Sequence, residues 1–176
     1  VLEGQADQPQ DRHLVLFKDG KAYDFALTKP HDVTVVDPAG GQIVLLSRDQ
    51  HVKSTIPNQD IVTAAAKFRV FAINEKMETR LGLDAQVFPP TGANSNYKIG
   101  FGPYHYEANA VAPTLPMQPA RFAEFTDWVA RVNLIRRLGT PPFARITLGQ
   151  AIAADGMVPA TLTLQIKSDR HSRTFR

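Results

Sequence analysis

Cysteine is absent from this chain of 176 residues. Without it the chain can form neither a disulfide framework nor a thiolate metal site, and it has no cysteine nucleophile. Long hydrophobic runs are missing as well, because stretches such as residues 43–46 fall far short of the roughly 20 residues that cross a bilayer. We therefore predict that this chain contains no transmembrane segment.

A cluster of charge of one sign is also lacking. The formal net charge is only +3, and lysine and arginine are scattered along the sequence. A nucleic-acid-binding protein would concentrate these residues on one helix or one face. Nucleic acid is therefore not an expected partner.

Recognisable catalytic and metal-binding motifs are missing too. Serine is scarce and occurs in neither a Gly-x-Ser-x-Gly nor a Ser-x-x-Lys context. The histidines are widely separated and form neither a His-x-His pair nor a His-Glu-x-x-His motif: they are His13, His31, His51, His105 and His171. With no cysteine to complete a ligand set, we expect no metal site and no cofactor.

The composition suits one folded core. Hydrophobic residues make up 43% of the chain, which is long enough for one core and short for two. We predict a polar lead-in at residues 1–12, a single domain at 13–167, and a basic tail or the start of a further strand at 168–176. Since the first residue is valine, we expect a chain trimmed by removal of a signal peptide or by truncation.

Glycine-containing turn signals predict hairpins in the first third of the chain. Asp19-Gly20 lies between apolar runs, and this dipeptide favours a tight hairpin turn. Residues 33–47, VTVVDPAGGQIVLLS, place a glycine pair between two further apolar runs. A phosphate-binding loop would need more glycines before a helix, or a closing Lys and Ser/Thr, and neither follows. The glycine pair is therefore predicted to turn the chain.

Later segments predict helices and more strands. Residues 56–74 and 120–139 carry apolar side chains every three or four positions, as amphipathic helices do. Residues 85–88 predict a short strand, and residues 97–111 predict a hairpin with one apolar and one wet face. The next segment is ambiguous: residues 143–148 fit a strand, whereas residues 148–154 fit a helix. The predicted fold class is α+β: a curved antiparallel sheet, built as a meander of hairpins, with two to three helices packed on one face.

An aromatic set is the most suggestive feature for function. Six of its members, on the apolar faces of the predicted hairpin and the predicted long helix, are candidate ligand-binding residues: Tyr97, Phe101, Tyr104, Tyr106, Phe125 and Trp128. One interpretation is a filled core in which the sheet face meets the helix face, and the spacing favours it. The other is a sheet that curves around the helix and leaves an apolar cavity for a lipid or other apolar small molecule.

Several segments in succession carry a resemblance. They are KDGKAYDF, VTVVDPAGGQIVLL, HVKSTIPNQDIV, FAEFTDWVARVNL and PPFARITLGQAIAADGMVPATLTLQI. From His13 to Lys167 the chain resembles an uncharacterised family of exported planctomycete-type bacterial proteins, in which an aromatic-Asp-Phe strand, a Val/Phe-Asp-Pro hairpin and a Pro-Pro-Phe-x-Arg segment recur in this order. The resemblance implies a periplasmic or cell-envelope location. At the level of fold alone, the chain is also distantly similar to lipoprotein carriers of LolA type. These carriers are antiparallel half-barrels closed by helices, and the cavity of the half-barrel binds acyl chains.

These observations lead to three function hypotheses. The first is a non-enzymatic exported domain that binds a hydrophobic, lipid-like ligand or a protein partner. The second is a structural or assembly component of the cell envelope, which makes contacts through sheet edges or through residues 167–176. The third is an enzyme without a recognisable motif, which would need a cleft where His105, Glu107 and a side chain from another strand converge.

Overall fold

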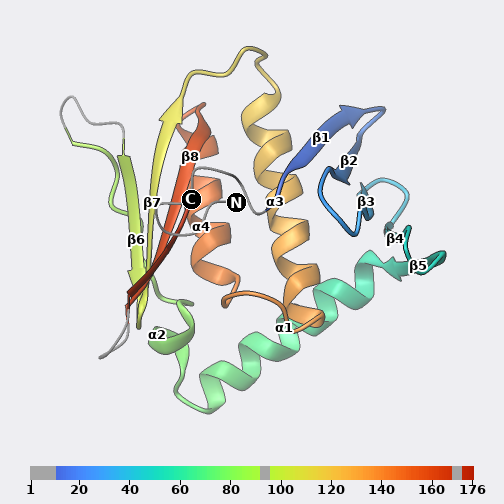
Figure 1. Ribbon diagram of the computed structural model, residues 1–176. Coiled ribbons are helices and arrows are strands. Elements are labelled where there is room, and N and C mark those ends of the chain that lie inside the picture. The colour runs from blue at the N-terminus through green and yellow to red at the C-terminus, as the bar shows by residue number, and fades with distance from the viewer. Residues whose placement is uncertain (1–10, 92–95, 168–171) are drawn as a thin grey trace. The chain divides into compact units, whose positions relative to one another are not determined.

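The computed structural model describes residues 11–91, 96–167 and 172–176. Its strands form two antiparallel sheets, and four helices accompany them in these residues (Figure 1). Neither sheet closes into a barrel within the described ranges. The predicted α+β class is confirmed.

The chain divides into two compact units, and the first unit ends at Ala64. The first unit contains a five-stranded sheet in which each strand pairs antiparallel with the next along the chain. Its strands are β1 (His13–Lys18), β2 (Lys21–Ala26), β3 (Val33–Asp37), β4 (Gln42–Ser47) and β5 (Val52–Pro57). The hairpins predicted around Asp19-Gly20 and around the glycine pair are confirmed. The single domain at 13–167 stays a prediction, and residues 1–10 of the predicted lead-in lie outside the described residues.

The turn between β3 and β4 explains the glycine pair. Gly41 has a φ of 69°, a left-handed conformation that glycine adopts readily. Gly40 is needed for space, because a Cβ at this position would lie 2.3 Å from Asp37 Oδ2. Its backbone N–H donates to Asp37 Oδ1 at 2.8 Å. The two glycines therefore turn the chain, as predicted.

The carboxylate of Asp37 organises this turn. Lys21 Nζ lies 2.8 Å from Asp37 Oδ2, and this hydrogen bond, with that from Gly40, holds the pKa of Asp37 below its ordinary value. Asn58, the first residue of α1 (Asn58–Asn74), donates its backbone N–H to Gly41 O at 2.9 Å. The turn thereby also holds the start of the helix.

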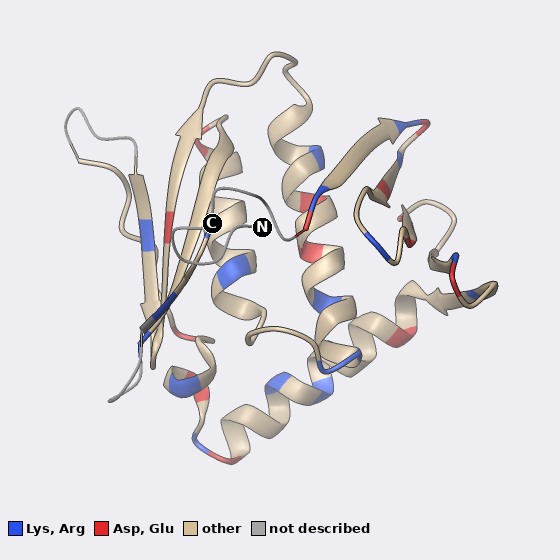
Figure 2. Ribbon diagram, in the orientation of Figure 1, with Lys and Arg blue, Asp and Glu red and all other residues tan. Residues whose placement is uncertain are grey.

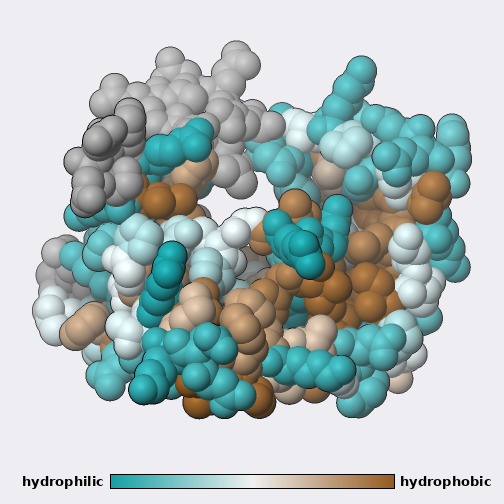
Figure 3. Space-filling model, turned by 90° about the horizontal axis from the view of Figure 1, so that it is seen from below, coloured by the Kyte–Doolittle hydropathy of each residue, from teal (hydrophilic) through white to brown (hydrophobic). Residues whose placement is uncertain are grey.

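The helix α1 buries a narrow stripe and leaves apolar side chains exposed. Ile61 and Ala72 are fully buried on that stripe. Exposed apolar residues occur in the last turns of the helix: Val70, Phe71 and Ile73. Figure 3, which views the molecule from below, shows apolar surface interspersed with hydrophilic surface.

The second unit contains the remaining elements. They are the short helix α2 (Glu78–Leu81), β6 (Asn96–Phe101), β7 (Tyr104–Val111), α3 (Gln118–Ile135), α4 (Phe143–Ala154), β8 (Val158–Lys167) and β9 (Ser172–Phe175). The four strands form one antiparallel sheet in the order β6-β7-β8-β9. The ambiguous segment at 143–148 is helical and forms the first half of α4. Of the predicted tail, residues 168–171 lie outside the described residues, and the rest contains β9.

The core of the second unit lies between α4 and one face of this sheet. Ala144, Leu148 and Ile152, spaced four residues apart on α4, are almost completely buried. They belong to one cluster with Ile99 and Ala108 of the hairpin formed by β6 and β7. Alternation along these strands turns the neighbouring polar side chains to the opposite face of the sheet.

The helices of the described residues show no membrane-spanning character. None of them is both long and apolar enough to cross a bilayer, as predicted. Along α3 two acidic residues lie between two basic ones, as Figure 2 shows. On α3, Asp127 and Arg131 form an ion pair one turn apart, as their spacing predicts.

Candidate functional site

The polar face of the second sheet is hollowed. A concavity of about 620 Å³ opens there, and its lining residues all belong to the second unit. Its size falls within the range of about 300–1,000 Å³ that is usual for small-molecule sites. The polar side chains around it are Thr79, Lys98, His105, Glu107, Thr163, Gln165 and Lys167.

One row of residues in the concavity begins at the exposed Phe88 and continues across β6, β7 and β8. Phe88 bridges to Lys98 at the outer edge of β6: the Phe88 N–H donates to Lys98 O at 2.8 Å, and the Lys98 N–H donates to Phe88 O at 3.0 Å. Lys98 pairs next with Glu107, and Glu107 pairs with Thr163. Because paired residues point to the same face of a sheet, the Phe88 side chain, which is 65% exposed, lies beside polar neighbours.

The charges in this row are weakly paired. Lys98 Nζ lies 3.6 Å from Glu107 Oε1, and the two side chains are 62% and 45% exposed. Asn96 Nδ2 donates to the same Oε1 at 2.9 Å. Exposed ion pairs contribute about 0–1 kcal/mol to stability, so a ligand can separate this pair at little cost.

A glycine forms part of the floor of the concavity. Gly100 pairs with His105, and His105 pairs with Gln165 in the next row of the sheet. A Cβ on Gly100 would lie 2.9 Å from His105 Nδ1, so the imidazole occupies the space that a side chain at position 100 would need. Because Gly100 has no side chain, the His105 ring can lie close to the sheet, and the concavity stays open.

Only two of the six aromatic candidates line the concavity. Four of them are buried side chains: Tyr97, Phe101, Tyr106 and Phe125. The remaining two, Tyr104 and Trp128, are half-buried. Phe101 and Tyr106 line the concavity, although their side chains belong to the core cluster on the other face of the sheet. Their role as an apolar ligand site stays a prediction.

Two of these tyrosines fasten α4 to the sheet. The Tyr97 hydroxyl donates to Asp155 Oδ2 at 2.6 Å, at the C-terminal end of α4. The Tyr106 hydroxyl shares a hydrogen bond of 2.5 Å with Thr140 Oγ1, just before the helix begins. Burial, together with the Asp155 carboxylate, raises the pKa of Tyr97 to about 12. Both hydroxyl groups are therefore satisfied within the fold.

Comparison with known proteins identifies no relative of this chain: no family model, no curated protein and no solved structure matches it. The resemblance to exported planctomycete-type proteins stays a prediction, and so do the similarity to LolA-type carriers and the export of the chain.

The third function hypothesis required a cleft shared by His105 and Glu107. Both residues do line the concavity, two positions apart on β7, together with Gln165 from β8. Sequence reasoning placed His105 and Glu107 on the wet face of the hairpin but did not single out Phe88 or Gln165. Strand pairing across distant segments brings these two residues to the site, and local spacing carries no signal of that pairing.

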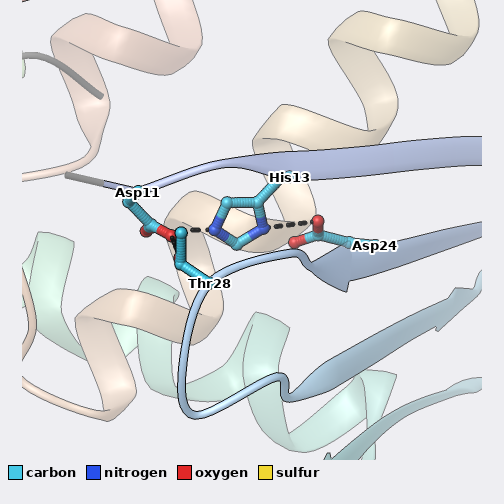
Figure 4. Close-up of polar contacts among 4 residues, drawn as sticks. All are labelled: Asp11, His13, Asp24 and Thr28. Carbon is cyan, nitrogen blue, oxygen red and sulfur yellow. Dashed lines mark hydrogen bonds and ion pairs between the residues drawn. The ribbon is translucent and has the colours of Figure 1, made fainter. Parts of the chain in front are cut away.

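A separate polar cluster lies in the first unit (Figure 4). His13 Nδ1 lies 2.7 Å from Asp24 Oδ1, and His13 Nε2 lies 3.1 Å from Asp11 Oδ2. Thr28 Oγ1 donates to Asp11 Oδ1 at 2.7 Å. The cluster joins the residues before β1 to β2 and to the loop after it. Among the described residues, no three His, Asp or Glu side chains form a group suited to a metal ion.

The His13 cluster makes the stability of the first unit depend on pH. Burial lowers the pKa of His13, but hydrogen bonds to Asp24 and Asp11 outweigh it, so the pKa is raised. Burial acts to raise the pKa of Asp11, while hydrogen bonds from Thr28 and His13 lower it overall. The His13 contribution is therefore complete below about pH 6.5 and is lost as pH rises through the raised pKa. The Asp11 contribution is present above about pH 4 and is lost in acid.

We expect His13→Gln to remove the loss of stability above pH 6.5. The wild-type free energy of unfolding should fall by about 0.5–1 kcal/mol more than that of the variant between pH 6 and pH 8.5, after allowance for solvent screening, since the His13 side chain is 39% exposed. Denaturant unfolding across this range measures the difference, and Asp24→Asn should reduce it too. Parallel pH profiles for wild type and His13→Gln would contradict the assignment.

Proposed function

We propose that the chain is a non-enzymatic binding protein whose second unit holds a short saccharide in the concavity on the polar face of its sheet. The observation that carries the proposal is the exposed Phe88 ring beside a row of mixed hydrogen-bonding groups. An aromatic ring that is left in water at the rim of a small-molecule-sized hollow is available to a ligand.

The chemistry of the lining favours hydroxyl groups over other ligands. Lys98 only donates hydrogen bonds, the ionised Glu107 only accepts them, and Thr163 and Gln165 do both. A lipid tail would form hydrogen bonds with none of these groups, and a strongly anionic ligand would meet the Glu107 carboxylate. Sugar hydroxyls both donate and accept, while the C–H face of a sugar ring can pack on Phe88.

The open shape of the site supports binding rather than catalysis. The Lys98 and Glu107 side chains are 62% and 45% exposed, so the charged groups remain in contact with water. Enzyme sites usually hold their reactive groups in a water-excluded setting that strengthens electrostatic effects. Binding of a lipid or a protein partner, a role in envelope assembly, and export stay predictions.

We expect Phe88→Ala to weaken saccharide binding about fivefold to tenfold, because an aromatic contact contributes about 0.5–1.5 kcal/mol beyond its buried area. Two-dimensional amide NMR titrations with cellobiose, maltose, lactose and chitobiose measure the dissociation constants. Shifts should concentrate at Phe88, at residues 98–102, and at His105 and Gln165.

The matched control is Leu115→Ala, which removes a side chain as exposed as Phe88 (66% against 65%) and outside the concavity. This variant should bind like the wild type. A parallel titration with laurate tests the lipid alternative. The proposal fails if none of the four disaccharides shifts the concavity amides, if laurate shifts them instead, or if Phe88→Ala binds as tightly as the wild type.

A further inference from the structure

The charges of the concavity are divided between its two ends. Among the described residues that line it, the acidic one is Glu107 and the lysines are Lys98 and Lys167. Lys98 and Glu107 share the row that begins at Phe88, and Lys98 Nζ lies 3.6 Å from Glu107 Oε1. Lys167 lies in a different row, beyond His105. One end of the concavity therefore holds a paired carboxylate, while the other end presents a cation.

Strand geometry sets the distance between these two ends. Along β8, Thr163, Gln165 and Lys167 alternate onto the polar face and line the concavity. Thr163 pairs with Glu107 and Gln165 pairs with His105, so Lys167 stands two rows from the carboxylate. Because a strand rises about 3.3 Å per residue, the rows of Thr163 and Lys167 lie about 13 Å apart. The Debye length is about 10 Å in 0.1 M salt, so the Glu107 charge is largely screened at the Lys167 end.

The backbone of Lys167 is fixed beside the turn that joins β6 and β7. Its N–H donates to Pro103 O at 2.9 Å, and on the other side Lys167 pairs with Ser172 of β9. The residue itself is exposed, so its ammonium group is accessible to a ligand in solution. An ammonium group carries a positive charge and three hydrogen-bond donors. The fold therefore places an anchored but accessible cation at this end of the concavity.

We propose that the saccharide in the concavity is acidic, with a carboxylate that Lys167 binds and a neutral sugar ring that packs on Phe88. This inference rests on the proposed saccharide function and adds the class of sugar. A hydrogen bond from an ammonium group to a carboxylate is about twice as strong as a neutral one. A single carboxylate at the Lys167 end stays away from Glu107, whereas a sugar charged at both ends would place like charges together there.

The test compares cellobiose with cellobiouronate, in which a carboxylate replaces one hydroxymethyl group of the same disaccharide. In amide NMR titrations at low ionic strength, cellobiouronate should have a dissociation constant about threefold to fivefold below that of cellobiose, the effect of a well-placed exposed ion pair. The preference should shrink as salt is added, because salt screens exposed charges. Differences in shift between the two sugars should concentrate at His105, Gln165 and Lys167. Differences confined to Phe88 and Lys98 would place the carboxylate at the wrong end and overturn the inference, whether or not a Lys167 variant folds.

Variants assign the preference to one side chain. Lys167→Gln should bring the two dissociation constants together, and Lys167→Glu should reverse their order. The matched control is Lys67→Gln, which removes the same charge from an exposed position of α1 outside the concavity and should keep the preference.

The outcomes separate this inference from the saccharide proposal. If cellobiose shifts the concavity amides but cellobiouronate binds no more tightly, or if the preference survives in Lys167→Gln, the acidic-sugar inference is overturned and the saccharide proposal stands. If neither sugar shifts these amides, the saccharide proposal itself fails, and the inference fails with it.

Discussion

Replacing Leu148 with alanine is expected to lower the free energy of unfolding of the second unit by about 2–5 kcal/mol, the range for removing a fully buried leucine. Leu148 is completely buried in the cluster between α4 and the sheet. The substitution removes apolar contacts and leaves a cavity that the surrounding side chains can only partly fill. For a domain of marginal stability this loss is large.

The only tryptophan of the chain makes it possible to follow the unfolding of the second unit. Trp128 lies in α3, so denaturant unfolding followed by tryptophan fluorescence reports the second unit. The exposed Leu115→Ala serves as the control and should change stability by less than about 0.5 kcal/mol. If Leu148→Ala lost less than 1 kcal/mol, the position of α4 on the sheet would be wrong.

Substituting alanine for Gly82 is expected to cost about 2–5 kcal/mol for two separate reasons. Gly82 ends α2 with a φ of 73°, and a left-handed conformation costs a residue with a side chain about 1–2 kcal/mol. A Cβ there would also lie 2.7 Å from Cγ of Phe101, which is buried and cannot move freely. Overpacking of this kind adds about 1–3 kcal/mol.

Gly156→Ala separates the two contributions. Gly156 has a φ of 70°, close to that of Gly82, but a Cβ at this position would meet no atom within 4 Å. This variant should lose only the conformational part, about 1–2 kcal/mol. Equal losses for Gly82→Ala and Gly156→Ala in the same fluorescence assay would show that the packing of α2 against Phe101 contributes nothing.

Local patterns predicted much of the fold. The Asp19-Gly20 dipeptide and the glycine pair marked their hairpins because each demands a backbone conformation that few residues adopt. The segment at 143–148 was ambiguous because its β-branched residues fit both states, and its packing on the sheet decides for the helix. The strand predicted at 85–88 is reduced to one bridge, at Phe88, since the prolines that follow cannot donate to a strand ladder.

The division of the strands between two sheets had no local signal. Each hairpin announces its own turn, but which hairpins join one sheet depends on pairings between distant segments. The concavity depends on the same pairings, because Gln165 reaches His105 only when β8 lies beside β7. The alternation of residues 97–111 did predict which side chains would be wet, so half of the candidate site was visible in the sequence.

The two sheets also imply different routes to the folded state. In the first sheet every strand pairs with its neighbour along the chain, so each ladder closes only a short loop. In the second sheet the pairing of β7 with β8 must wait until a long intervening segment, with both α3 and α4, has been brought back. Folding slows as contacts become less local. The first sheet can therefore form early, while the aromatic face that α4 covers stays open to solvent until the last long-range pairing is made.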